Sequence, residues 1–141
     1  MYINFPVAFW HKTTAKEAGN FTGHVQFLAP SYAIETNPKR WTQESIDLST
    51  MPANCAQTTL LFYIYGDQSV KLAETLSSLP SVEAQQQYLV EFYKPYYSRL
   101  PNYAEGDEAC TPIDCLATSW VADELAGNGS YTYELFKGTA R

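Results

Sequence analysis

The strongest hydrophobic pattern in the chain is a continuous apolar, β-favouring run at residues 58–65, which Gly66-Asp67 closes. A run without a polar face is typical of a central strand that is covered on both sides. We therefore expect this segment to form the middle of a sheet.

Shorter runs predict strands before it. Residues 2–5 are mainly apolar, Pro6 ends them and Phe9-Trp10 resumes the pattern, which favours a short strand at a sheet edge. The chain thus opens inside a strand, as a fragment of a longer protein would.

Residues 24–28 alternate between polar and apolar side chains, which indicates a half-buried strand with His24 on its exposed face. Pro30 breaks this run, and residues 32–34 are expected to continue it. Residues 35–56 are rich in polar and turn-forming types, so the sequence predicts no strand or helix there.

Two helices follow the central strand. Asp67 is the expected N-cap of the first, and Ser81 is the expected N-cap of the second, with Glu83 in its first turn. Pro95 is expected to end or kink the second helix. The apolar stripes, which we expect to face the core, comprise Val70, Leu72, Ala73, Leu76 and Leu79, then Tyr88, Leu89, Phe92 and Tyr93.

After an acidic loop at residues 99–114, a last strand is expected at residues 115–120. This order of strands and helices predicts an α+β fold, with a mainly antiparallel sheet and two helices packed on one face. The 141 residues are expected to form a single domain, residues 1–141.

Composition and charge narrow the classes of partner. Aromatic residues make up 15% of the chain and the formal net charge is −6, with the nine Lys and Arg residues scattered along it. Nucleic acids and anionic membranes need clustered positive charge, so we expect neither as a partner. The sequence also holds neither a signal-peptide pattern nor an apolar run long enough to span a bilayer.

The residues that usually carry catalysis or bind metals give weak signals. Cys55, Cys110 and Cys115 lack metal-ligand spacing, and we expect three free buried thiols, with a Cys110–Cys115 disulfide as the alternative. His11 and His24 have no partner implied by the sequence, and no G-x-S-x-G motif is present. A cofactor-free hydrolase is therefore disfavoured.

Residues 120–131 hold the most unusual segment, in which Trp120 is followed by a turn containing Gly127 and Gly129 that leads to Tyr131. The two glycines permit a positive φ or a close backbone approach. One interpretation is an ordinary hairpin turn of the Asn-Gly type. The other is that Trp120 and Tyr131 form aromatic walls of one pocket.

This tryptophan-to-tyrosine segment resembles the flavin-containing amine oxidases, the superfamily of monoamine, polyamine and L-amino-acid oxidases. In that family a strand ends in tryptophan, and a glycine-bearing turn delivers a tyrosine ten or eleven residues later, as Trp120, Gly127, Gly129 and Tyr131 do here. The order of the upstream elements is also similar. The resemblance spans nearly the whole chain, and the fungal members of the family look most similar to it.

The resemblance implies that the chain is most of the substrate-binding domain of such an enzyme. The family oxidises a C–N bond of an amine substrate by hydride transfer to FAD, and oxygen then reoxidises the flavin with formation of hydrogen peroxide. Tyr131 would be one wall of an aromatic cage for the amine, and Trp120 would lie near the flavin. Such a cage orients the amine nitrogen by π interaction and excludes water.

The family's dinucleotide fingerprint is absent, because the single G-x-G, at Gly127 and Gly129, does not open a helix. The resemblance thus implies a partial domain whose FAD-binding half is missing, and we expect the isolated chain neither to retain FAD nor to turn over. The alternative is a stand-alone, aromatic-rich module that binds a sugar or another small molecule.

Overall fold

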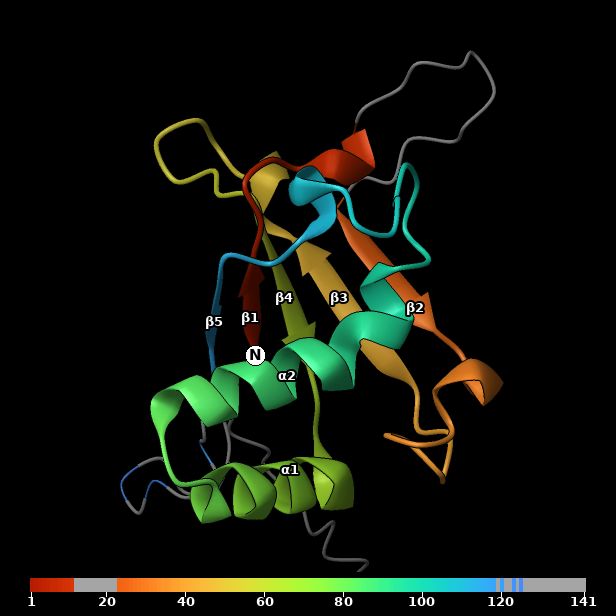
Figure 1. Ribbon diagram of the computed structural model, residues 1–141, viewed down its shortest axis with the longest axis vertical. Helices are drawn as coiled ribbons and strands as arrows, with labels where there is room; N and C mark the ends of the chain where they lie inside the picture. The colour runs from red at the N-terminus through yellow and green to blue at the C-terminus, as the bar shows by residue number, and fades with distance from the viewer. Residues whose placement is uncertain (12–22, 119, 121–122, 124, 126–141) are drawn as a thin grey trace, which may run out of the picture.

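The computed structural model describes residues 1–11, 23–118, 120, 123 and 125 (Figure 1). These residues form a five-stranded sheet in the order β2-β3-β4-β1-β5, in which every neighbouring pair is antiparallel, together with two α-helices. The α+β class with an antiparallel sheet is therefore confirmed.

The strands are short. They comprise β1 (Tyr2–Asn4), β2 (His24–Phe27), β3 (Gln43–Asp47), β4 (Thr59–Tyr63) and β5 (Asp114–Leu116). The predicted central strand is β4, which pairs with β3 on one side and β1 on the other. Leu60 and Phe62 are fully buried on one face of β4, but Leu61 and Tyr63 on the other face are half-buried. The prediction that β4 is covered on both sides therefore holds fully for one face and only in part for the other.

The helices are α1 (Gly66–Ser78) and α2 (Val82–Tyr97). The Ser81 hydroxyl caps α2 as predicted, since it accepts a hydrogen bond from the backbone N–H of Ala84 at 3.2 Å. α1 begins earlier than expected: Tyr65 is its N-cap, and Asp67 lies in the first turn. Pro95 does not end α2, because the helix continues to Tyr97.

Both helices contribute to one core on one face of the sheet. α2 crosses the sheet and α1 lies below it, near the end of β4 (Figure 1). The core contains the predicted stripe residues Leu72, Leu76, Leu89, Phe92 and Tyr93, and Tyr93 stacks on Phe62 of β4 with ring centroids 4.3 Å apart. Aromatic rings thus supply much of the contact between α2 and the sheet.

Two predicted strand segments form 3-10 helices instead. Phe9 and Trp10 lie in η1 (Phe9–His11), and both rings are buried. Adjacent side chains of a strand point to opposite faces, so an edge strand could not bury both in the same core. The segment predicted to extend β2 forms η2 (Ser31–Ala33), after Ala29 turns the chain with φ of 41°.

β3 was not expected, because the pattern of residues 35–56 is polar. Its buried side chains are Gln43, Ser45 and Asp47, while the apolar Ile46 points to the other face. Buried and less buried side chains alternate as in any strand, but the buried ones are polar. A search for alternating apolar residues therefore does not find this strand. At the other end of the chain, β5 stops at Leu116 and does not reach Trp120.

Candidate functional site

The predicted aromatic pair is described only in part. Trp120 is 48% exposed. Tyr131, Gly127 and Gly129 lie outside the described residues. The structure thus leaves the indole of Trp120 accessible for a contact, and its proximity to Tyr131 stays a prediction.

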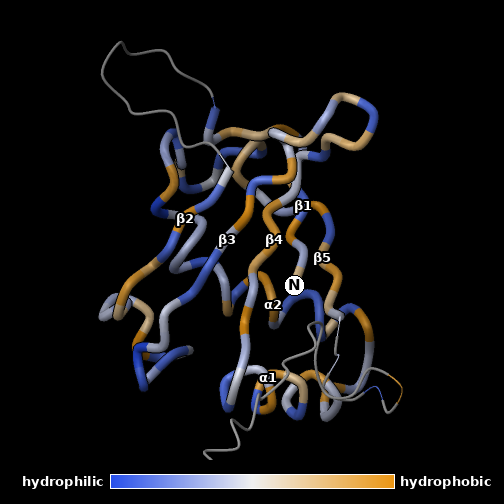
Figure 2. The backbone as a smooth tube through the Cα atoms, turned by 180° about the vertical axis from the view of Figure 1, so that it is seen from behind, coloured by the Kyte–Doolittle hydropathy of each residue, from blue (hydrophilic) through white to orange (hydrophobic). Residues whose placement is uncertain are grey.

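The face of the sheet opposite the helices, here called the open face, carries an apolar row across four strands. The strand register aligns Ile46 with Leu61, Leu61 with Tyr2, and Tyr2 with Leu116. Three of the four side chains are half-buried and Leu116 is 60% exposed. Seen from behind, no described helix crosses these strands (Figure 2).

A hollow of about 260 Å³ lies where the open face meets its β5 edge, and its lining includes Tyr2, Thr59 and Leu116. Cys115 also borders the hollow, but its side chain is buried, and this burial raises the pKa of its thiol to about 11, with a smaller contribution from the Asp114 carboxylate. A thiol with such a pKa is protonated at neutral pH and is a poor nucleophile.

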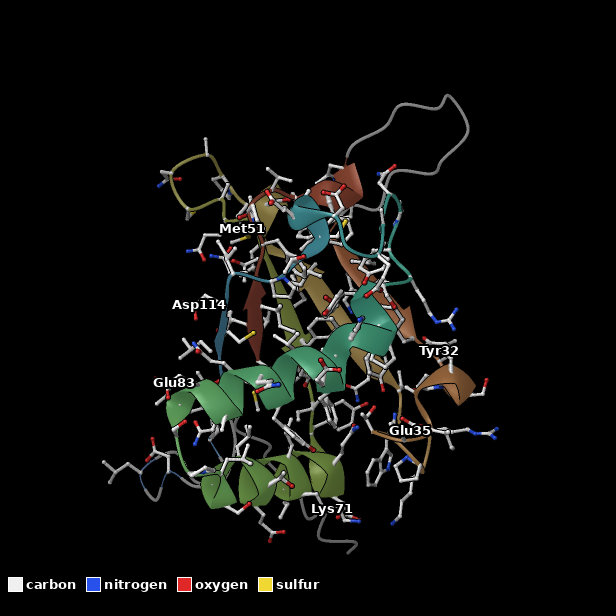
Figure 3. All side chains as sticks on the ribbon, viewed as in Figure 1. Tyr32, Glu35, Met51, Lys71, Glu83 and Asp114 are labelled. Atoms are coloured by element: carbon white, nitrogen blue, oxygen red, sulfur yellow. The ribbon has the colours of Figure 1, made fainter. Side chains whose placement is uncertain are left out.

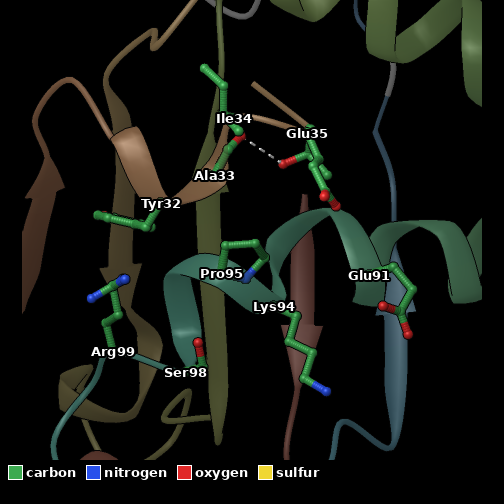
Figure 4. A pocket seen from close by; sticks show the side chains of 10 residues that line it. Tyr32, Ala33, Ile34, Glu35, Glu91, Lys94, Pro95, Ser98 and Arg99 are labelled. Carbon is green, nitrogen blue, oxygen red and sulfur yellow. Dashed lines mark hydrogen bonds between the residues drawn. The ribbon is translucent and has the colours of Figure 1, made fainter. Parts of the chain in front are cut away.

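A larger groove, of about 520 Å³, runs between η2 and the C-terminal half of α2 (Figure 4). This volume is within the range of small-molecule sites. Tyr32 and Glu35 of this groove lie beside the β2 edge, whereas Asp114 marks the β5 edge (Figure 3). The groove and the hollow are therefore separate features at opposite edges of the sheet.

One wall of the groove is a helical stripe, and the other is η2 with the turn that follows it. The stripe side chains repeat at intervals of three and four, which places them on one side of α2 and its end. They are Glu91, Lys94, Pro95, Ser98 and Arg99, facing Tyr32, Ala33, Ile34, Glu35 and Thr36. Both walls carry ionisable groups, so the groove is suited to a polar or charged ligand.

The two cations of the groove are held by neighbouring groups. Nζ of Lys94 lies 2.7 Å from Oε1 of Glu105, and this hydrogen bond is the main reason that the pKa of Lys94 is raised. The Arg99 guanidinium lies 3.6 Å from the ring centroid of Tyr32. Burial raises the pKa of the Tyr32 hydroxyl and the Arg99 charge opposes that effect, so Tyr32 stays a neutral platform at physiological pH.

His11 belongs to a cluster that the sequence did not reveal. Its Nε2 lies 2.6 Å from Oδ2 of Asp47 and 3.0 Å from Oγ of Ser49, two partners that the sequence does not imply. The Ser49 hydroxyl and backbone N–H both donate to Oδ1 of Asp47, at 2.7 Å and 2.9 Å. Asp47 is buried and is the N-cap of η3 (Leu48–Thr50).

This cluster contains the residue types of a hydrolytic triad but not its geometry. A triad histidine uses one ring nitrogen toward the aspartate and the other toward the serine. Here one nitrogen faces both groups, and the serine proton points at the carboxylate. The contacts join η1 to η3 around a buried carboxylate, so they stabilise the fold and do not activate Ser49.

The cysteines differ from expectation in one respect. Cys110 and Cys115 are free and buried as expected, but Cys55 is free and exposed. Within residues 1–11, 23–118, 120, 123 and 125, His, Cys, Asp and Glu form no group of three that could hold a metal ion. No helix in the same residues is long and apolar enough to cross a membrane.

Comparisons with protein-family models, with curated proteins and with solved structures gave no significant match.

The groove residues were not identified from the sequence, because Arg99 was placed in a loop and Tyr32 in a strand. The spacing of three and four residues from Glu91 to Arg99 could have identified one wall of the groove, the α2 side, from the sequence. Nothing in the sequence places η2 against that stripe.

Proposed function

We propose that this chain is part of the substrate-binding half of a FAD-dependent amine oxidase, which oxidises an amine substrate together with a FAD-binding half that this chain lacks. The sequence resemblance at Trp120 to Tyr131 supplies the family. The structural observation that supports the proposal is the apolar row on the open face.

An antiparallel sheet with helices on one face usually has polar side chains on the solvated face. Here Ile46, Leu61 and Leu116 form an apolar row on that face, aligned across neighbouring strands, with polar residues such as Glu44 and Asn4 in the rows beside it. Burying apolar surface contributes roughly 25 cal/mol per Å², so a second body packed on this row would gain stability from it. A half-enzyme whose other half docks on the sheet would have such a surface.

In this proposal the chain contributes aromatic groups rather than the reactive centre. Trp120, which is half-exposed, would lie near the flavin, and Tyr131 would form a wall for the amine. FAD bound by the other half would supply the hydride acceptor. The aromatic side chains orient the amine nitrogen and keep water from it.

The described residues do not fit FAD by themselves. The junction between β4 and α1 is a strand-to-helix turn, the place where a dinucleotide site would be built, but it carries a single glycine, Gly66. Asp67 in the first turn adds a negative charge where the pyrophosphate would bind. We therefore assign FAD binding to the absent half.

The first test is flavin retention by the 141-residue chain. We expect that, after incubation with FAD and desalting, the protein shows no flavin absorbance and produces no peroxide from a panel of amines. Stoichiometric flavin retention would contradict the assignment of FAD binding to a separate half.

The second test concerns the other half. We expect the genomic sequence flanking this reading frame to encode a glycine-rich dinucleotide motif upstream or a flavin-contacting segment downstream, and the joined protein to oxidise amines. Leu116→Lys on the open face should abolish flavin-dependent activity of the joined protein. Val82→Lys is the matched control, because Val82 is similarly exposed, at 63% against 60%, but lies at the start of α2. Equal effects of the two substitutions would contradict docking on the open face.

The groove favours a second candidate, a stand-alone module that binds a sugar or another small molecule. Its volume and its half-exposed Tyr32 are the observations in favour. Ligand binding by flavin-free protein, unchanged when FAD is added, would support the module over the oxidase.

A further inference from the structure

The groove between η2 and α2 holds a guanidinium that is stacked on an aromatic ring and has no anionic partner among the described residues. Arg99 stacks on the Tyr32 ring at 3.6 Å, and none of its side-chain nitrogens bonds a carboxylate within the described residues. Stacking uses the face of the guanidinium and leaves its in-plane N–H donors available. Such an arginine is suited to bind a carboxylate in the two-pronged manner that arginine favours.

The other end of the groove has the opposite charge. Glu35 on the η2 side and Glu91 on α2 form no ion pair within the described part of the chain (Figure 4). Lys94, which lies between Glu91 and Arg99 along the stripe, has its ammonium bonded to Glu105. The charges that remain open to a ligand are therefore positive at the Arg99 end and negative at the Glu35 and Glu91 end.

Pro95 adds a neutral hydrogen-bonding group between the two ends. A proline inside a helix has no N–H, so the carbonyl four residues earlier, that of Glu91, loses its helical donor. That carbonyl belongs to a residue of the groove wall. It is an acceptor suited to a backbone N–H of a ligand.

The length of the stripe sets the length of the ligand. Arg99 lies eight positions after Glu91, which corresponds to about 12 Å at the rise of a helix. An extended peptide advances about 3.3 Å per residue, so three or four residues span the groove.

We propose that this groove binds the C-terminal end of a peptide chain that carries a basic residue two or three positions before its last residue. Arg99 takes the terminal carboxylate, with the Ser98 hydroxyl beside it. Glu35 and Glu91 take the basic side chain, and the Glu91 carbonyl accepts a peptide N–H. This site is independent of the proposed oxidase function, because it lies at the β2 edge and does not involve the open face.

The test is fluorescence anisotropy of the full 141-residue chain with a labelled peptide ending in Gly-Lys-Ala-Leu and a free carboxylate. The same peptide as a C-terminal amide and a peptide with Glu in place of Lys are the comparison ligands. Loss of a charge-assisted pair corresponds to about tenfold or more in Kd, so both should bind at least tenfold more weakly.

Two groups of variants locate the binding. Arg99→Gln should remove the preference for the free carboxylate over the amide, and the Glu35→Gln/Glu91→Gln double variant should remove the preference for Lys over Glu. Arg40→Gln and a Glu74→Gln/Glu108→Gln double variant make the same charge changes at exposed residues outside the groove and should leave both preferences intact.

A readout on the unsubstituted chain removes any dependence on the folding of the variants. Amide chemical-shift changes on adding the free-carboxylate peptide should centre on residues 32–36 and 91–99. Equal affinity for acid and amide, shifts centred elsewhere, or no binding up to about 1 mM peptide, the weak limit of specific recognition, would each overturn the proposal.

Discussion

The two faces of the sheet are made from alternate residues of the same strands, yet their apolar side chains are buried to different extents. On the helix face, Ile3, Leu60 and Phe62 are fully buried in the core to which both helices contribute. On the open face, Leu61 lies between Leu60 and Phe62 in sequence and is only half-buried. The difference shows that the packed helices, and not the apolar character of the strand, decide which side chains form the core.

β3 sharpens this comparison because its polarity is reversed. Its helix-face side chains are polar and buried, and Gln43 donates a hydrogen bond to Gln68 of α1. Its apolar residue, Ile46, lies on the open face. Burying polar groups and exposing apolar groups both raise the free energy of an isolated domain. The exposed apolar groups are the reason to expect a partner on the open face.

The largest effect on the free energy of unfolding should come from truncating one side chain on each face of β4. Phe62→Ala removes a fully buried ring that stacks on Tyr93 and should lower the free energy of unfolding by about 3–5 kcal/mol. Leu61→Ala removes a half-buried side chain from the other face and should cost about 1 kcal/mol. Urea titration of both variants measures the difference. Equal losses would show that the open face is packed as tightly as the helix face.

The next effect is a dependence of stability on pH that arises at the helix-face end of β1. Burial lowers the pKa of the Met1 amine from 8.0 to about 6, and this amine donates to the Phe62 carbonyl at 2.9 Å. Between these two pKa values the unfolded chain binds the proton and the folded chain does not. The free energy of unfolding should therefore rise by about 2 kcal/mol from pH 6 to pH 8.

Denaturant titrations across this pH range measure the rise. Acetylation of the Met1 amine removes the titrating group, so the acetylated chain should show no such rise. A rise of the same size in the acetylated chain would assign the effect to other groups.

A smaller effect on stability, of opposite sign at two positions, should distinguish a tyrosine of α2 whose hydroxyl is hydrogen-bonded from one whose hydroxyl is not. The Tyr93 hydroxyl is buried and has no partner within the described residues, so Tyr93→Phe should stabilise the protein by about 1 kcal/mol. The Tyr96 hydroxyl accepts a hydrogen bond from Asn37 at 3.2 Å, so Tyr96→Phe should destabilise it by about 1 kcal/mol. Thermal melts of the two variants check the signs, and a destabilised Tyr93→Phe protein would reveal a partner for that hydroxyl.

The smallest perturbation is labelling of the thiols. Cys55 is exposed, whereas Cys115 of β5 is buried, and this burial raises its pKa to about 11. Titration with a chromogenic disulfide at pH 8 should modify Cys55 rapidly, and Cys110 and Cys115 should react only after denaturant is added. Rapid reaction of Cys115 in the folded protein would show that the hollow at the β5 edge opens into the core.

The sequence by itself determined the elements whose hydrophobic pattern matches their environment. The apolar run around Leu60 and Phe62 gave β4 and its central position, and Ser81 gave the start of α2. The stripe of Leu89, Phe92 and Tyr93 gave the buried side of that helix. These are local signals, because a strand or helix that buries one side must repeat apolar residues at its own period.

Only the tertiary structure decided the features that join distant segments. It placed η2 beside the Glu91 to Arg99 stripe, brought His11 to Asp47 across 36 residues, and joined the buried Gln43 of β3 to Gln68 of α1. Their pattern could not be read in advance, because the burial of a polar side chain depends on packing and hydrogen-bond partners that other segments of the chain supply. Which face of the sheet stays uncovered was decided in the same way, by where the helices pack.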